Sequence, residues 1–210
     1  MIKILIADDH TILREGLKKV IHGEPDMRVT GEARDGAEAI GKVTREDYDC
    51  IILDLSMPGR SGLEVLKDIK ILKPKTPVLI LTLHPEEQYA KRALKAKASG
   101  YLTKSGAPAE LIEAIRKVCA GGRYITASLA EALVTDLSWN SEKMPHERLS
   151  DRELAVARLI ASGRTVSEIA EELSLSVKTV STYRSRALEK MGFQNNAEIT
   201  HYFIKEGLVD

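Results

Sequence analysis

The sequence predicts an α/β fold with a parallel sheet for the first part of the chain and a smaller all-α domain for the last part. Up to Gly121, short apolar runs alternate with longer segments of helical periodicity, an order typical of a parallel sheet with helices on both faces. From Leu149 onward, short helical segments begin at Ser, Thr or Asn. One apolar run, Cys50–Leu53, leads directly into Asp54 and a turn. This pattern places Asp54 at the carboxyl end of a strand buried on both faces.

Strands and helices alternate along the first part of the chain. We expect strands at Ile2–Ala7, Arg28–Ala33, Cys50–Leu53, Val78–Leu83 and Tyr101–Thr103. We expect helices at Thr11–His22, from Asp35 and Gly36 onward, and at residues 62–72, 86–96 and 109–120. Helical periodicity assigns these side chains of the first two helices to the core: Ile12, Leu13, Leu17, Val20, Ile21, Ala37, Ala39, Ile40 and Val43.

Polar side chains stand where four of these strands end. Asp8 and Asp9 follow the first strand, Asp54 ends the third, Thr82 lies near the end of the fourth, and Lys104 follows the fifth. In the strand order 2-1-3-4-5 these ends are neighbours. Close carboxylates repel and raise one another's pKa, and a divalent cation such as Mg²⁺ offsets that repulsion. A Lys and a hydroxyl can hold phosphoryl oxygens, and an Asp carboxylate can attack phosphorus as a nucleophile.

Two other interpretations of these residues are available. Asp54 taken alone would be interpreted as a cap of the next helix. Because polar residues also stand at three neighbouring strand ends, we favour a role for Asp54 as a nucleophile toward phosphorus. An aspartate-nucleophile phosphatase would use a second Asp two positions after Asp54, where this chain has Ser56. His10 is interpreted as a loop residue.

The bulk composition excludes several classes of protein. Lys+Arg and Asp+Glu are both 31, so global charge does not indicate a nucleic-acid or membrane partner. The 2 cysteines, Cys50 and Cys119, stand in apolar surroundings without metal-ligand spacing and are interpreted as core thiols of a reducing compartment. The N-terminus reaches acidic residues too early for a signal peptide, and no apolar run approaches the ~20 residues of a membrane helix. We expect a soluble, cytoplasmic protein.

Residues 1–121 resemble the receiver domain of two-component response regulators. The resemblance rests on Asp8-Asp9, Asp54, Thr82 and Tyr101-x-x-Lys104, in this order and at these strand ends. It implies a flavodoxin-like fold with the sheet order 2-1-3-4-5. It also implies that Asp54 accepts a phosphoryl group from the phosphohistidine of a sensor histidine kinase.

The same resemblance implies roles for the residues around Asp54. Mg²⁺ would be held directly by Asp9 and Asp54, mainly through water by Asp8, and by the carbonyl of Ser56. Thr82 and Lys104 would contact the phosphoryl oxygens, and Tyr101 would turn inward in the active state. Ser105 stands where many receivers have Pro.

A linker and a second domain follow the receiver-like part. Residues 122–147 read as a linker, with a helix from Tyr124 to Leu137 and a flexible tether from Ser138 to Glu147. The apolar spacing of that helix comes from Leu129, Ala132, Leu133 and Leu137. Residues 148–210 read as four capped helices. Their caps and ends are Ser150 to Ala161, Thr165 to Leu173, Ser176 to Met191, and Asn195 to Glu206. The tight turn Ser174–Ser176 between two of them indicates a helix-turn-helix.

The segment from Leu149 to Phe193 resembles the LuxR/NarL-type four-helix DNA-binding domain. With the receiver it indicates the NarL/FixJ class of transcription regulators, with the last two helices nearest to the GacA-like branch. The helix 177–191 carries four basic residues against one acidic residue, enough for phosphate contacts. The resemblance assigns base contacts to Ser181, Thr182 and Ser185, and phosphate contacts suit Lys178, Thr179 and Arg186. Ser181 stands where many relatives have Lys, so we expect modest direct base readout.

A helical wheel at ~100° per residue gives this helix an apolar arc toward the core. The arc consists of Val177, Val180, Ala187, Leu188 and Met191. Arg184 falls within the arc, and an unpaired buried charge is costly. We therefore expect Arg184 to pair with Glu153 or Glu168, with Glu168 slightly favoured.

These expectations combine into a DNA-binding transcription regulator that phosphorylation switches, and that is not an enzyme. Phosphate biases a two-state equilibrium, and the active form binds double-stranded promoter DNA as a homodimer, with RNA polymerase as a candidate partner. The expected dimer contacts of the terminal helix are Ile199, Tyr202, Phe203 and Leu208. Two rivals are a receiver whose C-terminal helices bind a protein partner, and a regulator that works without phosphate.

Overall fold

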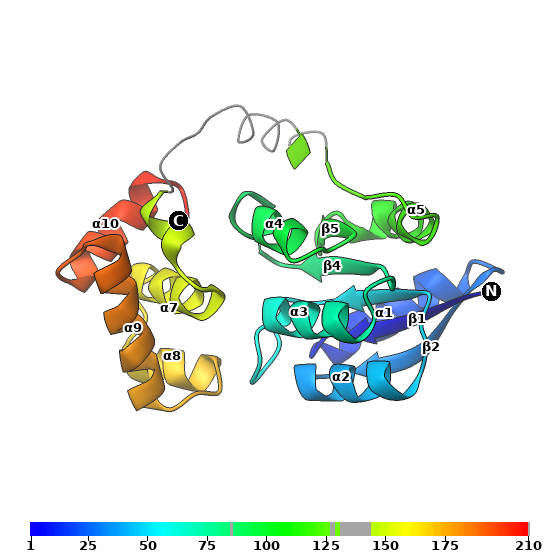
Figure 1. Ribbon diagram of the computed structural model, residues 1–210, viewed down its shortest axis with the longest axis horizontal. Coiled ribbons are helices and arrows are strands. Elements are labelled where there is room, and N and C mark those ends of the chain that lie inside the picture. Colours follow the sequence, from blue (N-terminus) through cyan, green and yellow to red (C-terminus); the bar gives the residue numbers. More distant parts are fainter. Residues whose placement is uncertain (85, 127–128, 131–143, 210) are drawn as a thin grey trace. The chain divides into compact units, whose positions relative to one another are not determined.

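The computed structural model of the chain describes all residues except 85, 127–128, 131–143 and 210 (Figure 1). The chain divides into two compact units, Met1–Ser138 and Trp139–Asp210. Each unit has a buried core of its own.

The first unit is a five-stranded parallel sheet with strand order β2-β1-β3-β4-β5. Its strands are β1 (Ile2–Ala7), β2 (Met27–Ala33), β3 (Cys50–Leu53), β4 (Val78–Thr82) and β5 (Gly100–Thr103). Its helices are α1 (Thr11–His22), α2 (Gly36–Arg45), α3 (Gly62–Leu72), α4 (Glu86–Lys95) and α5 (Ala107–Cys119). The predicted sheet order is confirmed, and the predicted element boundaries differ from these by at most two residues.

Helices cover both faces of this sheet. Helices α1 and α5 lie on one face and α2, α3 and α4 on the other (Figure 1). On the first face, Ile4 and Ile6 of β1 pack in one cluster with Leu17 of α1 and Ile115 of α5. All four residues of β3 are buried, because both faces of a central strand are covered. Cys50 lies in the same cluster and Cys119 packs against it, both as free thiols.

The segment after α5 returns to the edge of the sheet. Tyr124 forms an isolated parallel bridge with Gly100. The amide of Tyr101 donates to the carbonyl of Tyr124 at 3.1 Å, and the amide of Tyr124 donates to the carbonyl of Ser99 at 3.0 Å. A Cβ at Gly100 would lie 2.8 Å from the Tyr124 carbonyl oxygen, so this close approach requires glycine.

The apolar faces of α1 and α2 are narrower than predicted. Ile12 is 90% exposed and Val20 is 41% exposed, because the buried stripe of α1 runs at four-residue spacing through Leu17 and Ile21. On α2, Ala37 is exposed. These three assignments to the core are wrong, and Leu13 and Ile40 are half-buried.

The second unit is all helical in its described residues. It contains a short 3₁₀ helix η1 (Pro145–Arg148), α7 (Asp151–Ala161), α8 (Val166–Glu172), α9 (Val177–Met191) and α10 (Asn196–Lys205). The side chains of the four predicted caps, Ser150, Thr165, Ser176 and Asn195, each accept from the backbone amide three residues on. Gly192 ends α9 in the left-handed conformation, as glycine after a helix typically does.

Two expectations for the linker have different outcomes. The 3₁₀ helix η1 occupies the end of the stretch expected to be a flexible tether, where Pro145 supplies a helix-compatible first residue. The start of the predicted helix from Tyr124 to Leu137 is wrong, because residues 124–126 are not helical and Tyr124 bridges Gly100 instead. Leu129 and Ala130 are helical, and Leu129 is buried. Residues 127–128 and 131–137 of that prediction lie outside the described residues.

Burial in the second unit corrects two predictions. Ile199 and Phe203 are fully buried in the core of the unit, so they are not available as contacts of a dimer face. Val177, which the helical wheel assigned to the core, is 51% exposed, and the buried face of α9 begins at Val180.

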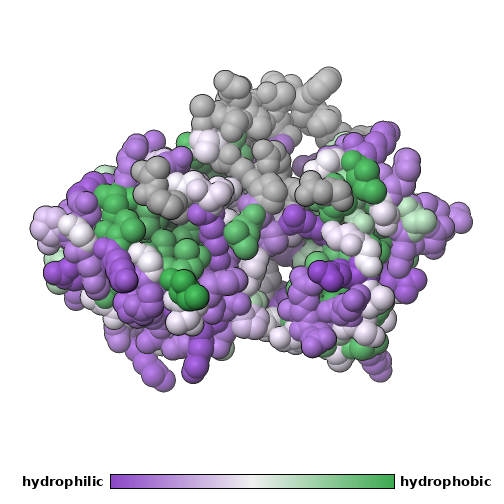
Figure 2. All heavy atoms as spheres, turned by 180° about the vertical axis from the view of Figure 1, so that it is seen from behind, coloured by the Kyte–Doolittle hydropathy of each residue, from purple (hydrophilic) through white to green (hydrophobic). Residues whose placement is uncertain are grey.

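Among the described residues, every helix is too short or too polar to span a membrane. The face drawn in Figure 2 is largely hydrophilic, with separate hydrophobic patches. Exposed large apolar residues include Ile12, Ile71, Leu83 and Ile204.

Candidate functional site

Four strand ends of the first unit meet at one edge of the sheet. The strand register aligns Ala7 with Leu53 and Thr82 with Thr103, so the residues that follow are brought together. The amide of Asp54 donates to the carbonyl of Ala7 at 2.9 Å. Asp8, Asp54 and Thr82 are buried, with at most 2% of each exposed. Parallel strand order therefore produces the cluster that the sequence pattern predicted.

Lys104 connects the two buried carboxylates. Its Nζ lies 2.7 Å from Asp8 Oδ2 and 2.7 Å from Asp54 Oδ2, and its side chain is only 6% exposed. Burial alone would lower the pKa of Lys104, but the hydrogen bonds that it donates to Asp54 and Asp8 outweigh burial and raise this pKa. A charged ammonium therefore stands between two carboxylates that would otherwise repel each other.

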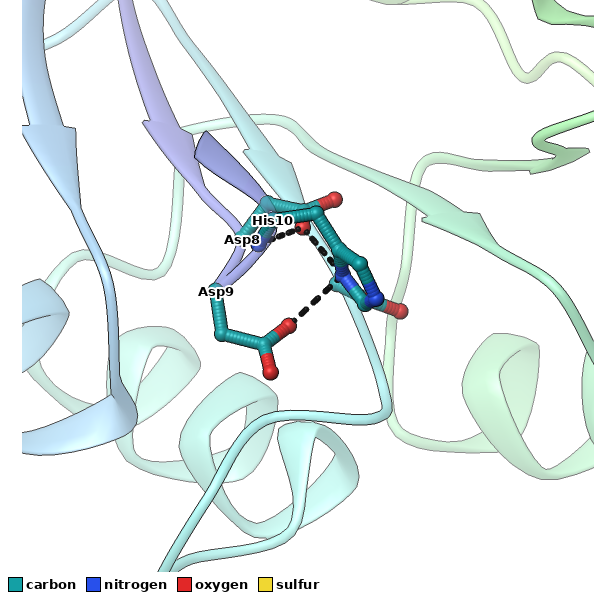
Figure 3. A group of neighbouring side chains, drawn as sticks. Asp8, Asp9 and His10 are labelled. Carbon is teal, nitrogen blue, oxygen red and sulfur yellow. Dashed lines mark hydrogen bonds and ion pairs between the residues drawn. The ribbon is translucent and has the colours of Figure 1, made fainter. Parts of the chain in front are cut away.

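Asp9 and His10 form the open side of the pocket. His10 Nδ1 lies 2.8 Å from Asp9 Oδ1 and 3.0 Å from Asp8 Oδ1, as the dashed lines in Figure 3 show. The amide of His10 also donates to Asp8 Oδ1 at 2.8 Å. The carbonyl of Asp8 accepts from Arg14 Nη1, which fixes the backbone at this turn. The interpretation of His10 as a loop residue missed its contact with both acids.

The donor set fits a divalent cation. Asp8, Asp9, His10 and Asp54 each offer one ligand atom, and these atoms all lie within 4.8 Å of one another. Carboxylate oxygens are the ligands that Mg²⁺ takes in proteins. Ser56 lies at the same edge, where its amide donates to Asp54 Oδ1 at 3.1 Å.

Thr82 and Tyr101 lie beside the pocket and meet through His84. The Tyr101 ring is buried, and its hydroxyl donates to the carbonyl of His84 at 2.9 Å. Thr82 Oγ1 accepts from the amide of His84 at 3.4 Å. The ring of His84 stacks on Tyr89, with ring centroids 4.4 Å apart, and its Nε2 lies 2.9 Å from Ser56 Oγ. His84 thus links the pocket to α4. Sequence analysis missed this residue, although its position two residues after Thr82 is a signal that could have identified it.

The second candidate site is the outer face of α9. Lys178, Thr182, Ser185 and Arg186 are exposed, and Thr179 and Ser181 are half-buried. The Thr182 hydroxyl donates to the carbonyl of Lys178 at 2.9 Å, and Thr179 Oγ1 lies 2.7 Å from Ser176 Oγ. The predicted contact residues therefore share one face of α9. The hydroxyls of Thr182 and Thr179 already form hydrogen bonds within the helix and with its N-cap.

The predicted partner of Arg184 is wrong. Its Nε donates to Asn196 Oδ1 at 2.8 Å, which joins α9 to the first turn of α10. Glu153 pairs with Lys190 instead, at 2.6 Å. Glu168 Oε2 accepts from the amide and the hydroxyl of Thr165. The helical wheel correctly predicted that Arg184 faces neighbouring helices. It could not show that Asn196, at the start of α10, lies closer to Arg184 than Glu153 and Glu168 do.

Comparison with known proteins assigns both units to families. Residues 4–116 match the response regulator receiver domain, and residues 147–203 match the bacterial regulatory proteins of the luxR family. The chain is a LuxR-type response regulator. This response regulator is 35% identical to response regulator UvrY of Escherichia coli K12 over 99% of the chain and 96% of UvrY. It is also 35% identical to response regulator GacA of Pseudomonas protegens, over 100% of the chain and 99% of GacA.

A solved structure supports the same assignment for the LuxR-type response regulator. RcsB of Salmonella enterica serovar Typhimurium, solved bound to promoter rprA in the presence of the phosphomimetic BeF3⁻, is similar with a TM-score of 0.65 and 29% identity. The match covers 96% of this chain and 97% of that one. The expected family, with GacA-like relatives, is confirmed.

Proposed function

We propose that this response regulator accepts a phosphoryl group on Asp54 from a sensor histidine kinase and then binds double-stranded promoter DNA as a homodimer. The buried Asp54 carboxylate, held by Lys104 beside Asp8, carries the proposal. The proposed domains are a receiver at 1–121, a linker at 122–147 and a DNA-binding domain at 148–210. The proposed role is transcription regulation in the cytoplasm rather than enzyme catalysis, with RNA polymerase as a candidate partner.

Phosphoryl transfer would use Asp54 as the nucleophile. A carboxylate oxygen of Asp54 attacks phosphorus, the new P–O bond forms, and the P–N bond to the kinase imidazole breaks. The leaving imidazole takes a proton from solvent. Lys104, already 2.7 Å from Asp54 Oδ2, would then donate to the phosphoryl oxygens.

Mg²⁺ is the proposed cofactor, held by Asp9 and Asp54, by Asp8 through water, and by the carbonyl of Ser56. When bound, it supplies positive charge that offsets repulsion between these acids and the phosphoryl oxygens.

Thr82 and Tyr101 would transmit the change. The Thr82 hydroxyl would turn to a phosphoryl oxygen, and the Tyr101 ring, which is already buried, would keep its inward position in the active state. The contacts of both residues with His84 support this coupling. Phosphate would bias a two-state equilibrium rather than create a new fold.

The outer face of α9 would contact DNA. Lys178, Thr179 and Arg186 would bind phosphates, and Ser181, Thr182 and Ser185 would lie toward base edges. The exposure of four of these residues on one basic helix supports the proposal. The RcsB structure with bound promoter rprA is consistent with a DNA-binding role for this unit.

The phosphoacceptor is tested by labelling with acetyl phosphate and Mg²⁺. Asp54→Asn should take up no phosphoryl group, because an amide cannot form an acyl phosphate, and Asp9→Ala should be labelled more slowly. Asp47→Asn is the matched control, since Asp47 is an exposed acid paired with Lys73, and it should be labelled like the wild type. Stoichiometric labelling of Asp54→Asn would contradict the proposal.

Promoter footprinting separates the rival functions. We expect protection of promoter DNA that strengthens with the phosphodonor. Protection of equal strength for the wild type without a phosphodonor and for Asp54→Asn would indicate a regulator that works without phosphate. Failure to protect any promoter fragment would favour a protein partner for the second unit.

A further inference from the structure

Among the described residues, His10 is the imidazole grouped with the three carboxylates of the pocket, with its ligand atom within 4.8 Å of theirs. The proposed function uses Asp9 as a direct cation ligand and Asp8 through water, and it gives His10 no role. Yet His10 Nδ1 lies 2.8 Å from Asp9 Oδ1 and 3.0 Å from Asp8 Oδ1, between the two carboxylates in Figure 3. The nitrogen therefore stands among the atoms that would bind the cation.

The spacing of these atoms is that of neighbouring metal ligands. In an octahedral site with bonds of about 2.1 Å, adjacent ligand atoms lie about 3.0 Å apart, because they subtend a right angle. His10 Nδ1 meets this spacing with Asp9 Oδ1, the oxygen of the proposed direct ligand, at 2.8 Å. The side chains of Asp8 and Asp54 are at most 3% exposed, whereas that of His10 is 52% exposed, so the imidazole borders the open side of the site.

The carboxylate oxygens divide between two neighbours. Asp8 Oδ2 and Asp54 Oδ2 face the Lys104 ammonium. Asp8 Oδ1 and Asp9 Oδ1 face the His10 imidazole. A cation cannot replace the covalently attached ammonium, but it can share the oxygens that the imidazole faces.

We propose that His10 Nδ1 is a ligand of the divalent cation in this pocket and that it shifts the preference of the site from Mg²⁺ toward first-row transition ions such as Mn²⁺. Imidazole is a borderline ligand that first-row transition ions accept, whereas Mg²⁺ favours oxygen and keeps several waters. The inference rests on the proposed cation site and deepens it, because it names a further ligand and a class of metal.

The test is pulsed electron paramagnetic resonance of Mn²⁺ bound to the full-length protein without phosphodonor. A directly bound imidazole nitrogen gives a characteristic nuclear modulation. We expect this modulation in the wild type and in His84→Asn, and its loss in His10→Asn. His84 is the matched control, because its imidazole contacts Ser56 at the same edge of the sheet. In titrations, His10→Asn should weaken Mn²⁺ binding about tenfold and leave Mg²⁺ binding nearly unchanged.

Each other outcome has a defined meaning. Mn²⁺ that binds to the wild type without nitrogen modulation would overturn the role of His10 and leave the proposed function intact. In that case the imidazole only bridges the two acids by hydrogen bonds and is displaced by the cation. Modulation that persists in His10→Asn would also overturn it. Absence of saturable Mn²⁺ and Mg²⁺ binding by the wild type would overturn the proposed cation site itself.

Discussion

The ammonium of Lys104 balances charge at the centre of the pocket. Two carboxylates that are nearly inaccessible to water accept hydrogen bonds from it. Buried carboxylates need a partner of opposite charge, since the loss of hydration would otherwise favour their protonation. One ammonium thus supplies the opposite charge for both Asp8 and Asp54.

Replacement of Lys104 by Gln should destabilise the protein in the absence of Mg²⁺. The change leaves two buried carboxylates without their cation, and we expect a loss of about 1–3 kcal/mol in the free energy of unfolding. Urea unfolding with and without Mg²⁺ measures it. Mg²⁺ should stabilise Lys104→Gln more than the wild type, because it replaces the missing positive charge.

Lys73→Gln is the control for this measurement. Lys73 forms an ion pair with the well-exposed Asp47, and such surface pairs contribute little. Equal unfolding midpoints of Lys104→Gln and Lys73→Gln without Mg²⁺ would contradict the role given to Lys104.

At the scale of single elements, α9 separates a buried packing face from an exposed basic face, which is the proposed DNA contact. Val180, Ala187 and Met191 are buried, whereas Lys178 and Arg186 are exposed. Two polar side chains on its flanks join it to other helices: Arg184 bonds Asn196 of α10, and Lys190 bonds Glu153 of α7.

Arg184 and Arg186 should therefore respond differently to replacement by Ala. Arg184→Ala removes the hydrogen bond to Asn196 and should lower stability by about 1 kcal/mol. Arg186→Ala should change stability by less than ~0.5 kcal/mol. It should weaken DNA binding and reduce its salt slope by about 1. Melting curves and salt titrations of the two variants decide the matter, and a reversed pattern would contradict the assignment.

The ion pair of Glu153 gives a pH-dependent prediction. Burial would raise the pKa of Glu153, but hydrogen bonds with Lys190 and Ser150 outweigh burial and lower it below 4.5. A carboxyl whose pKa is lowered by folding contributes stability above its unfolded pKa and loses that contribution as pH falls through the folded pKa. Glu153→Gln keeps a side chain able to cap α7, so it isolates the ion pair.

We expect Glu153→Gln to be less stable than the wild type by about 1 kcal/mol at pH 7. The difference should shrink as pH falls below 4.5. Urea midpoints measured from pH 7 down to the acid limit test this, and a difference independent of pH would show that the ion pair is not its source.

The starts of capped helices could be predicted from the sequence, whereas contacts between different helices and loops could not. The caps Ser150, Thr165 and Ser176 fixed helix starts because cap chemistry is local. Ile12 was assigned to the core although it is 90% exposed, because helical periodicity does not give the width of the buried stripe. The partner of Arg184 depends on how α10 packs, and the contacts of His10 depend on a turn that no periodic pattern describes.

For the whole molecule, the response regulator combines a receiver unit with a LuxR-type DNA-binding unit. A single LuxR-type unit is small, and helix-turn-helix proteins usually read paired half-sites. Ile199 and Phe203 lie in the core, and Ile204 is the large apolar residue of α10 that is exposed, at 55%. Tyr202 and Leu208 are half-buried beside it.

The phosphorylated protein should bind DNA with two half-sites much more tightly than DNA with one. Two linked binding events gain effective concentration, and we expect a difference on the order of a hundredfold. Ile204→Glu should weaken binding to the paired site and leave the single half-site unaffected. Titrations of both DNAs test this, and equal affinity of the wild type for one and two half-sites would argue against a dimer.

The bridge between Gly100 and Tyr124 bears on how the receiver can be isolated. Backbone groups on the edge of a sheet are templates for pairing with another chain. Tyr124 occupies two of these groups on the β5 edge, and its hydroxyl is anchored to Glu110 of α5 at 2.9 Å. A fragment that ends at residue 121 loses this cover, whereas one that ends at residue 126 retains it. Light scattering at equal concentration should find the shorter fragment prone to aggregate and the longer one monodisperse.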